Sequence, residues 1–417
     1  MILVNPAPLQ NRKISTQCCV VGGGPAGMML GYLLARAGIE VVVLEKHKDF
    51  FRDFRGDTIH PSTMELMYEL GILDDFLELP HQKIVKLMLS FEGKTVEGPD
   101  CSHLPVHCPY IALMPQWDFL NFIAEKAKSF PSFSLCMSSE VTDLIEEDGC
   151  VAGVMAKTET GGLEVRAGLV FGTDGRSSIV RQRAGLHVED FGVPIDVLWF
   201  RLPRPADDPL HFLGRIRNGQ MMVTIDRGDY YQTALIIPKG AFGPIKEEGL
   251  EAFRTRISSI APVLRESVKE LDDWEKVKLL TVQINRLRRW CRPGLLCIGD
   301  AAHAMSPAGG VGINLAIQDA VATANLLSAA ILRDNCTVAD LERIQQRRQW
   351  PTNMIQAIQV FIHRNMFKKN KDPSRAVAIP WPVRKLFALF APILRRVAAR
   401  IVGIGFRPEH VHSPGKR

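Results

Sequence analysis

The segment that constrains the fold most is a glycine-rich turn near the N-terminus, Gly22-x-Gly24-x-x-Gly27. A β-prone run precedes the turn, a run of small and apolar residues follows it, and a second apolar run ends at Glu45. These three runs cover residues 17–21, 28–37 and 40–44. A strand, a glycine turn, a helix and a second strand in this order predict a βαβ unit and therefore a parallel sheet.

Each glycine of the turn has a mechanical reason. The first permits the tight turn, the second lets the backbone approach a pyrophosphate, and the third lets the helix pack closely on the strand. Unpaired N–H groups and the dipole at the N-terminus of the helix favour phosphate. The cofactor-binding residues that we assign to this turn are Gly22, Gly24, Pro25, Ala26 and Gly27.

The acid at the end of the second strand, Glu45, selects among nucleotides. A carboxylate in this position accepts hydrogen bonds from an unphosphorylated adenosine ribose and repels a 2′-phosphate. The site therefore favours FAD or NAD over NADPH. The alternative is a glycine-rich turn that binds no ligand, and the complete βαβ context makes that interpretation the weaker one.

A second glycine-rich segment follows a short apolar run at residues 295–298 and precedes a helix predicted at residues 312–330. It reads GDAAH at 299–303 and PAGGVGIN at 307–314. Together with the first motif, this pattern resembles the second flavin motif of the para-hydroxybenzoate hydroxylase-like flavoproteins, which are FAD-dependent aromatic hydroxylases.

The resemblance implies how this segment holds FAD. Asp300 would contact the ribityl chain, and the backbone at the helix N-terminus would hold the pyrimidine edge of the flavin, where the dipole stabilises negative charge. The cofactor-binding residues implied here are Asp300, Pro307, Gly310, Val311, Gly312, Ile313 and Asn314. The family often has paired prolines after GDAAH, whereas this chain has Ser306 and Pro307. We expect flavin binding to survive this change but the peptide nearest to the flavin C4a to differ.

Three smaller matches occur in the order typical of the family. Residues 172–178, GTDGRSS, resemble the DG motif, which contacts both FAD and NAD(P)H in relatives, and they place Asp174 at the cofactor. Arg55 resembles a flavin-contacting arginine, and Gln116 matches a glutamine that contacts the cofactor in relatives. For Arg55 and Gln116 a purely structural role is an equal alternative.

The fold class predicted from these motifs is α/β. A Rossmann-like FAD-binding domain of the hydroxylase type is joined by an inserted β-rich substrate domain and a helical C-terminus. A chain of 417 residues has room for two interleaved domains. The FAD-binding domain is expected at residues 15–80, 106–185 and 283–330, the substrate domain at 81–105 and 186–282, and the helical segment at 331–417.

The resemblance also implies a reaction. NAD(P)H, as a transient co-substrate, reduces the flavin, and O2 then gives a flavin C4a-hydroperoxide that hydroxylates or epoxidises an aromatic, quinone-like or polyketide-type small molecule. No residue stands out as a catalytic base. Tyr230, Tyr231 and His303 are more simply structural, and the cluster Arg286, Arg288 and Arg289 is more simply a solvated face than a phosphate site.

Three alternative functions stay open at this point. A flavin-dependent halogenase shares the FAD domain, although the chain lacks the WxWxIP signature of that class. A prenyl-chain reductase belongs to the same superfamily. A non-catalytic relative would keep FAD only as a structural element.

Composition bears on partners and location. The net charge of +6 is a mild basic bias, and no basic tract interleaved with aromatic residues indicates nucleic-acid binding. Nine cysteines without a CxxC pair or a Cys/His cluster predict reduced thiols, no metal site and a cytoplasmic protein. Nothing in the sequence indicates an oligomeric state.

Residues 379–405 combine an apolar helical stripe with basic side chains and no acid. The stripe comprises Val383, Leu386, Phe387, Phe390, Leu394, Val397 and Ile401. The cations are Arg384, Lys385, Arg395, Arg396 and Arg400. We expect a helix that caps the core and is kinked at Pro392; a weak contact with a membrane surface is the alternative.

Overall fold

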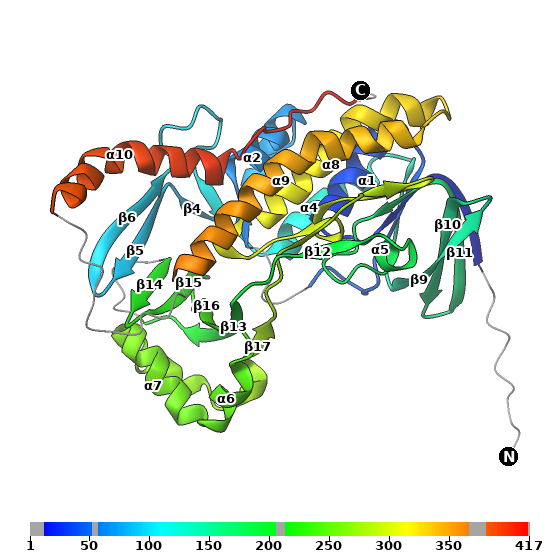
Figure 1. The fold of residues 1–417 in the computed structure, drawn as a ribbon. Helices are drawn as coiled ribbons and strands as arrows, with labels where there is room; N and C mark the ends of the chain where they lie inside the picture. Colours follow the sequence, from blue (N-terminus) through cyan, green and yellow to red (C-terminus); the bar gives the residue numbers. More distant parts are fainter. Residues whose placement is uncertain (1–11, 52–56, 206–212, 367–380, 416–417) are drawn as a thin grey trace, which may run out of the picture.

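The structure is a computed structural model that describes residues 12–51, 57–205, 213–366 and 381–415. For residues 365–366 and 381–390 it describes the backbone path alone. Figure 1 shows two main sheets, with long helices running across them.

The first sheet has eight strands and contains the predicted βαβ unit. β1 (Arg12–Val21) lies parallel between β11 (Gly161–Gly172) and β2 (Val41–Leu44). The sheet continues on one side through β20 (Leu295–Cys297) and β19 (Cys291–Arg292), and on the other through β8 (Phe133–Cys136). The parallel βαβ opening predicted from the glycine turn is thereby confirmed.

A meander extends this sheet. β9 (Ser139–Glu147) and β10 (Cys150–Thr158) pair antiparallel with each other, and β10 pairs antiparallel with β11. Asp148 and Gly149 form the turn between them with φ of 49° and 78°. β11 continues from the meander into the parallel sheet without interruption, so the buried residues 169–171 belong to the same strand as Gly161.

Three helices pack against one another beside this sheet. α1 (Pro25–Arg36) contacts both α4 (Gln116–Lys128) and α8 (Gly312–Leu332). The segment Ala308–Leu332 is long and apolar enough to cross a membrane, but its most apolar window is 78% buried inside the protein. α8 is therefore a core helix, because its apolar side chains already have protein neighbours.

The second sheet has seven strands in the order β17-β13-β16-β15-β14-β5-β6. Its members are β5 (Lys86–Phe91), β6 (Lys94–Asp100), β13 (Ile195–Pro203), β14 (Gly214–Arg217), β15 (Gln220–Asp226), β16 (Tyr230–Pro238) and β17 (Lys278–Leu280). Its strands come from two distant parts of the chain, residues 86–100 and 195–280. The domain boundaries that we assigned stay a prediction.

The two faces of this second sheet bury different side chains. Phe200 joins a cluster with Phe253 of α7 (Leu250–Ile260), while its neighbour Trp199 joins a cluster with Ile111 and Ala399. Adjacent strand residues point to opposite faces, so at most one of the pair can line a given cavity. The structure places Trp199 on the face opposite α7.

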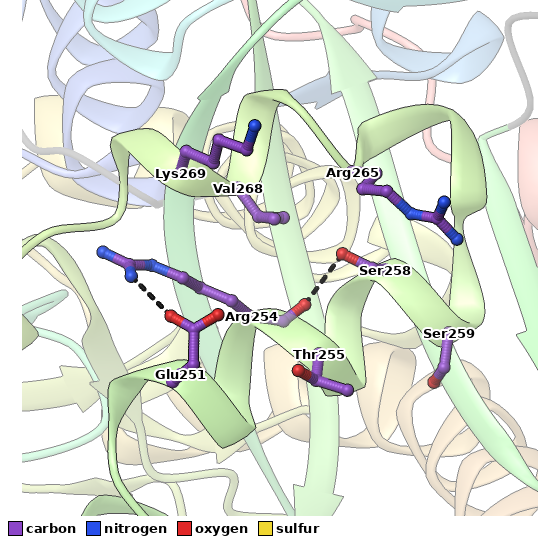
Figure 2. A pocket seen from close by; sticks show the side chains of 8 residues that line it. All are labelled: Glu251, Arg254, Thr255, Ser258, Ser259, Arg265, Val268 and Lys269. Atoms are coloured by element: carbon purple, nitrogen blue, oxygen red, sulfur yellow. Dashed lines mark hydrogen bonds and ion pairs between the residues drawn. The ribbon is translucent and has the colours of Figure 1, made fainter.

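A surface pocket of about 480 Å³ lies on the outer side of α7. Figure 2 shows Arg254 paired there with Glu251, and the Ser258 hydroxyl donating to the Arg254 carbonyl. None of the glycine-motif residues lines this pocket. It is therefore separate from the site predicted from the sequence.

The remaining elements are shorter or lie toward the C-terminus. Two small sheets contain β3 (Thr58–Ile59), β4 (Gln82–Ile84) and β7 (Ile111–Leu113), and β12 (Val188–Asp190), β18 (Asn285–Leu287) and β21 (His303–Ala304). The other α-helices are α2 (Pro61–Glu69), α3 (Leu73–Leu77), α5 (Ile179–Arg183), α6 (Phe242–Glu247), α9 (Val338–Met366) and α10 (Trp381–Gly403). The 3-10 turns are η1 (Pro262–Leu264), η2 (Ser267–Glu270), η3 (Trp274–Lys276), η4 (Gly299–Ala301) and η5 (Ala308–Gly310).

The last turns of α10 pack on the core. Ala399 is fully buried, and a Cβ on Gly403 would lie 2.8 Å from the Leu104 side chain, so the helix approaches closely there. Earlier in the helix, Leu394 and Val397 of the predicted stripe are 48% and 50% exposed. The stripe members between residues 383 and 390 lie outside the described side chains.

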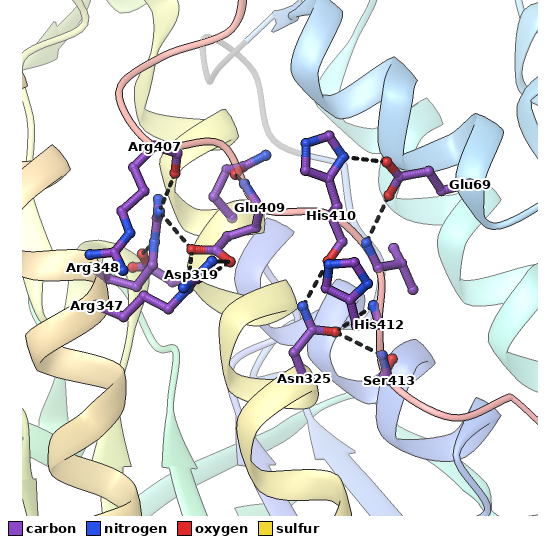
Figure 3. A network of polar contacts seen from close by, with 12 residues as sticks. Glu69, Asp319, Asn325, Arg347, Arg348, Arg407, Glu409, His410, His412 and Ser413 are labelled. Atoms are coloured by element: carbon purple, nitrogen blue, oxygen red, sulfur yellow. Dashed lines mark hydrogen bonds and ion pairs between the residues drawn. The ribbon is translucent and has the colours of Figure 1, made fainter.

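A buried ionic cluster fastens the C-terminal tail to α8 and α9. Arg348, 1% exposed, donates from Nε to Asp319 at 3.0 Å and from Nη1 to Glu409 at 3.2 Å. Figure 3 shows these side chains converging from three segments of the chain, with Arg347 adding a second cation beside Glu409. Buried charges are tolerated only when paired, so this cluster requires all three segments to be in place.

We expect Arg348→Met to lower the free energy of unfolding by about 3–5 kcal/mol, because two buried carboxylates would lose their shared cation. Urea denaturation of the purified protein measures this. Arg343→Met, on the same helix, is the matched control, since Arg343 is 60% exposed and pairs with Asp340 at 3.6 Å. That change should cost at most about 1 kcal/mol. Equal effects of the two substitutions would contradict the assignment.

Candidate active site

Four adjacent parallel strands end at the same edge of the eight-stranded sheet. Leu44, Val21, Gly172 and Cys297, the last residues of β2, β1, β11 and β20, lie side by side in the strand register. The residues that follow these strands include Glu45, the glycine turn, the DG motif and the GDAAH motif. Motifs far apart in the sequence therefore meet at one place because their strands are neighbours.

The glycine turn has the geometry that the motif predicts. Gly22 has φ of +105°, and a Cβ there would lie 2.7 Å from the Thr173 carbonyl. A Cβ on Gly27 would lie 1.9 Å from the Gly22 carbonyl, so only glycine allows the helix to approach the strand. Gly24, the N-cap of α1, faces open space and has no side-chain cap, and Pro25 and Ala26 follow it in the first turn of the helix.

Glu45 lies beside this turn and is 9% exposed. Its Oε2 accepts a hydrogen bond from the Gly23 N–H at 2.9 Å, and its Oε1 accepts one from the His47 N–H at 3.1 Å. The side chain thus joins the end of β2 to the glycine turn. Its contact with a ribose stays a prediction.

The DG motif holds the glycine turn from the other side. The Thr173 hydroxyl donates to the carbonyls of Val21 and Gly22, both at 2.8 Å. Asp174 accepts from the Val180 N–H at 3.1 Å, and burial raises the pKa of its carboxyl group. The motif predicted a role at the cofactor for Asp174 but did not indicate the contacts of Thr173, which depend on β1 and β11 being neighbours.

An ion pair joins the DG motif to the second flavin motif. Arg176 Nη2 lies 3.4 Å from Asp300 Oδ2, and both side chains are 32% exposed. Arg176 Nη1 and Asp174 Oδ1 are buried polar atoms without a hydrogen-bond partner among the described residues. Unsatisfied polar atoms next to a part-exposed carboxylate fit a polar ligand such as the sugar and phosphate chain of FAD.

The second motif folds into two tight turns before α8. Gly309 and Gly310 have φ of +81° and +63°, which disfavours a side chain at either position. The Thr58 hydroxyl donates to the Gly310 carbonyl at 3.0 Å. A Cβ on Gly310 would lie 2.2 Å from the Thr58 hydroxyl oxygen. Gly312, the first residue of α8, faces open space beside Val311, which provides no side-chain cap.

Asn314 connects this motif to α2. Its Oδ1 accepts from the His60 N–H at 3.1 Å and from the Thr63 hydroxyl at 2.6 Å. Burial lowers the pKa of His60 to about 4, so its ring is neutral at pH 7 and its Nδ1 donates to the Val402 carbonyl at 2.6 Å. Neighbouring Ile313 and Val311 are buried, and Pro307 is exposed.

The open N-termini of α1 and α8 are the strongest reason why the residues present fit FAD. A helix N-terminus without a side-chain cap offers N–H groups and a partial positive charge to anionic groups. The first would meet the pyrophosphate and the second the pyrimidine edge of the flavin, with Asp300 between them along the ribityl chain. These assignments stay proposals.

For two predicted cofactor residues the structure describes no contact that supports the prediction. Arg55 lies outside the described residues. Gln116 is the first residue of α4 and is part-buried, and no contact of its side chain supports a role at the cofactor.

A buried ion pair that the sequence did not indicate involves Asp57, two positions after Arg55. Asp57 pairs with Arg227 at 2.9 Å, and their side chains are 3% and 8% exposed. Arg227 comes from the turn between β15 and β16, so the pair ties the second sheet to the loop that precedes β3. No local pattern could have indicated it, because 170 positions separate the two residues.

His303 of the GDAAH motif and two arginines of the basic cluster at residues 286–289 have partners within the protein. His303 is 1% exposed and its Nε2 lies 2.6 Å from Asp319 Oδ2, which confirms a hydrogen-bonding role. Arg288 pairs with Glu189, and Arg289 pairs with Glu342. The basic cluster is thus a face of paired surface charges.

Comparison with known proteins identifies the family. The FAD binding domain family matches residues 15–356. The chain is similar to 6-methylpretetramide 4-monooxygenase of Streptomyces rimosus, with 33% identity over 390 residues that cover 93% of this chain and 92% of the relative.

Two solved structures share the fold. p-Nitrophenol 4-monooxygenase PnpA of Pseudomonas putida DLL-E4 has a TM-score of 0.73 at 19% identity, covering 94% of this chain and 97% of that one. The myxobacterial chondrochloren halogenase CndH has the same TM-score at 16% identity, covering 96% and 95%. A hydroxylase and a halogenase thus have the same backbone arrangement, so at these identities the likeness shows the fold alone.

We expect Glu45→Ala to weaken FAD binding on the order of 10- to 100-fold, because a charge-assisted hydrogen bond to the ribose is lost. Titration of the apoprotein with FAD, followed by flavin fluorescence, measures this. Glu40→Ala is the matched control, because Glu40 is an exposed acid five positions earlier. Unchanged FAD affinity in the Glu45→Ala variant would show that this carboxylate does not contact the cofactor.

Proposed function

Because the chain belongs to the para-hydroxybenzoate hydroxylase-like family of FAD-dependent aromatic hydroxylases, we propose that it hydroxylates a phenolic, fused-ring substrate of the polyketide type. The chain is an FAD-dependent monooxygenase, and NAD(P)H is its electron donor. The observation that carries the substrate class is the 33% identity to 6-methylpretetramide 4-monooxygenase, which covers 93% of this chain and 92% of the relative.

The chemistry divides between the cofactor and the chain. Bound FAD supplies the redox chemistry: reduction by NAD(P)H, reaction with O2 and delivery of one oxygen atom. The chain binds and orients the cofactor through the strand ends described above. The N-termini of α1 and α8 favour negative charge on the pyrophosphate and on the reduced ring.

A buried apolar cluster beside the second sheet supports the substrate class. The face of the second sheet opposite α7 carries Val197, Trp199 and Ile225, and this cluster also includes Leu113 of β7. We propose that the flat substrate lies against this face. Arg227 and Asp57 fix the end of the same sheet to the loop beside Gly310, so the substrate surface and the flavin end of the site keep a defined distance.

The reaction is tested with an anaerobically reduced, FAD-loaded enzyme that is mixed with labelled O2 and a tetracyclic phenol. We expect the product to contain one labelled oxygen atom, and NADPH oxidation to accelerate when the tetracyclic phenol is present. A single-ring phenol serves as the size control and should accelerate it less, because it buries less apolar surface. Substrate consumption without label incorporation would favour the reductase alternative, and a halide-dependent product would favour the halogenase.

Cytoplasmic location and the contact of residues 379–405 with a membrane surface both stay predictions. Exposed Ile393, Leu394 and Val397 lie next to exposed Arg396 and Arg400, a composition that suits anionic lipid. However, Arg395 is paired with Glu97 of β6, and the end of the helix is fastened to the core. These contacts favour the interpretation that α10 caps the core.

We therefore expect the intact protein to stay unbound in flotation with anionic phospholipid vesicles at low salt. Flotation that the substitution Leu394→Asp abolishes would instead establish the membrane contact. Thr337→Asp, on an exposed loop at the start of α9, controls for the added negative charge.

A further inference from the structure

The segment between the GDAAH motif and α8 is held by two buried side chains of α9. Gln359, 3% exposed, accepts the Ser306 N–H at 3.1 Å and donates from Nε2 to the carbonyls of Ser306 and Ala308, both at 3.0 Å. One amide side chain thus satisfies three backbone groups of this segment.

His363 adds a second contact one helical turn later. Its Nε2 lies 2.8 Å from the Ser306 hydroxyl oxygen, which also accepts the Ala308 N–H at 3.2 Å. His363 and Ser306 are 4% and 2% exposed. The serine side chain therefore bridges α9 and the backbone two residues further on.

The segment needs such contacts because its own sequence does not fix it. Gly309 and Gly310 adopt positive φ values, and glycine leaves the backbone with the most conformational freedom. A proline at position 306 would restrict φ but would have no N–H to donate to Gln359. Ser306, which stands where the family often has the first of two prolines, keeps that N–H.

We propose that Gln359 and His363 are positioning residues that fix residues 306–310, and with them the flavin end of the FAD site, in place of a proline. The inference rests on the FAD site proposed above. Both side chains act through Ser306 and Ala308, and neither is assigned a contact with the cofactor. The conformation of Gly309 and Gly310 then follows from α9 as well as from α8.

The same helix provides a matched control. Gln356, 2% exposed, lies three residues before Gln359 and donates from Nε2 to the carbonyls of Asn285 and Ala304 at 2.9 and 3.0 Å. It is an equally buried glutamine with two backbone acceptors. Its partners belong to β18 and β21 and lie outside residues 306–310.

The experiment compares Gln359→Leu, Gln356→Leu and the intact protein in FAD titrations and in the visible spectrum of the bound flavin. Both substitutions should lower the unfolding midpoint of the apoprotein, because Gln359→Leu removes three buried hydrogen bonds and Gln356→Leu removes two. Only Gln359→Leu should raise the Kd for FAD, about tenfold, and shift the flavin absorption bands. Equal changes in Kd for the two variants, or no change in Gln359→Leu, would overturn the proposal.

Two smaller changes keep the test decisive if Gln359→Leu does not fold. Ser306→Ala removes only the hydroxyl, and His363→Ala removes only its partner, so their effects on the Kd for FAD should be less than additive when combined. Additive effects would show that the two side chains act independently and would contradict the proposal.

Hydrogen exchange of the apoprotein separates this inference from the function on which it rests. The backbone amides of Ser306 and of residues 308–310 should exchange faster in Gln359→Leu and at the unchanged rate in Gln356→Leu. If the intact protein binds no FAD, the proposed function fails, whereas this exchange pattern still reports on the positioning of the segment. Unchanged exchange in Gln359→Leu would refute the positioning role itself.

Discussion

A single buried carboxylate, Asp319, holds together the parts of the chain that form the flavin end of the site. Burial opposes its ionisation, but His303 and Arg348 hold its pKa below the usual value, so it is charged in the folded protein. Asp319 accepts the Gly299 N–H at 3.1 Å as well as the two side-chain contacts. The start of the GDAAH motif is thus fixed to the middle of α8 and, through Arg348, to α9 and the C-terminal tail.

Electrostatics also explain why the motifs can bind an anionic ligand at the place where they meet. Helices α1 and α8 begin without side-chain caps, and both begin near the edge at which the four parallel strands end. Two partial positive charges near the Asp300–Arg176 pair form a site for an elongated ligand with an anionic middle and an electron-accepting end. FAD has that chemistry, and the order of the strands sets the order in which its parts would be bound.

Contacts between the second sheet and Asp57, just before β3, determine how the proposed substrate site is placed. Gln232 of β16 contacts Asp57 together with Arg227, so the second sheet holds the loop before β3 through a charged and a neutral side chain. Thr58, the next residue, contacts Gly310. Two contacts to Asp57 and one from the adjacent Thr58 therefore join the second sheet, which carries Trp199, to the turn before α8.

The sequence by itself determined the βαβ opening, the positions that must be glycine, the acid at the end of β2 and the order of the flavin motifs. These features depend on residue spacing and local backbone geometry, so a Cβ that would collide 1.9 Å from a carbonyl at Gly27 could be anticipated from the motif alone. Only the tertiary structure decided that β11 runs unbroken from Gly161 to Gly172, that Asp57 pairs with Arg227, and that Gln359 holds Ser306. Such contacts join segments tens to hundreds of positions apart, and no local pattern records which distant partner will satisfy a buried charge or backbone N–H.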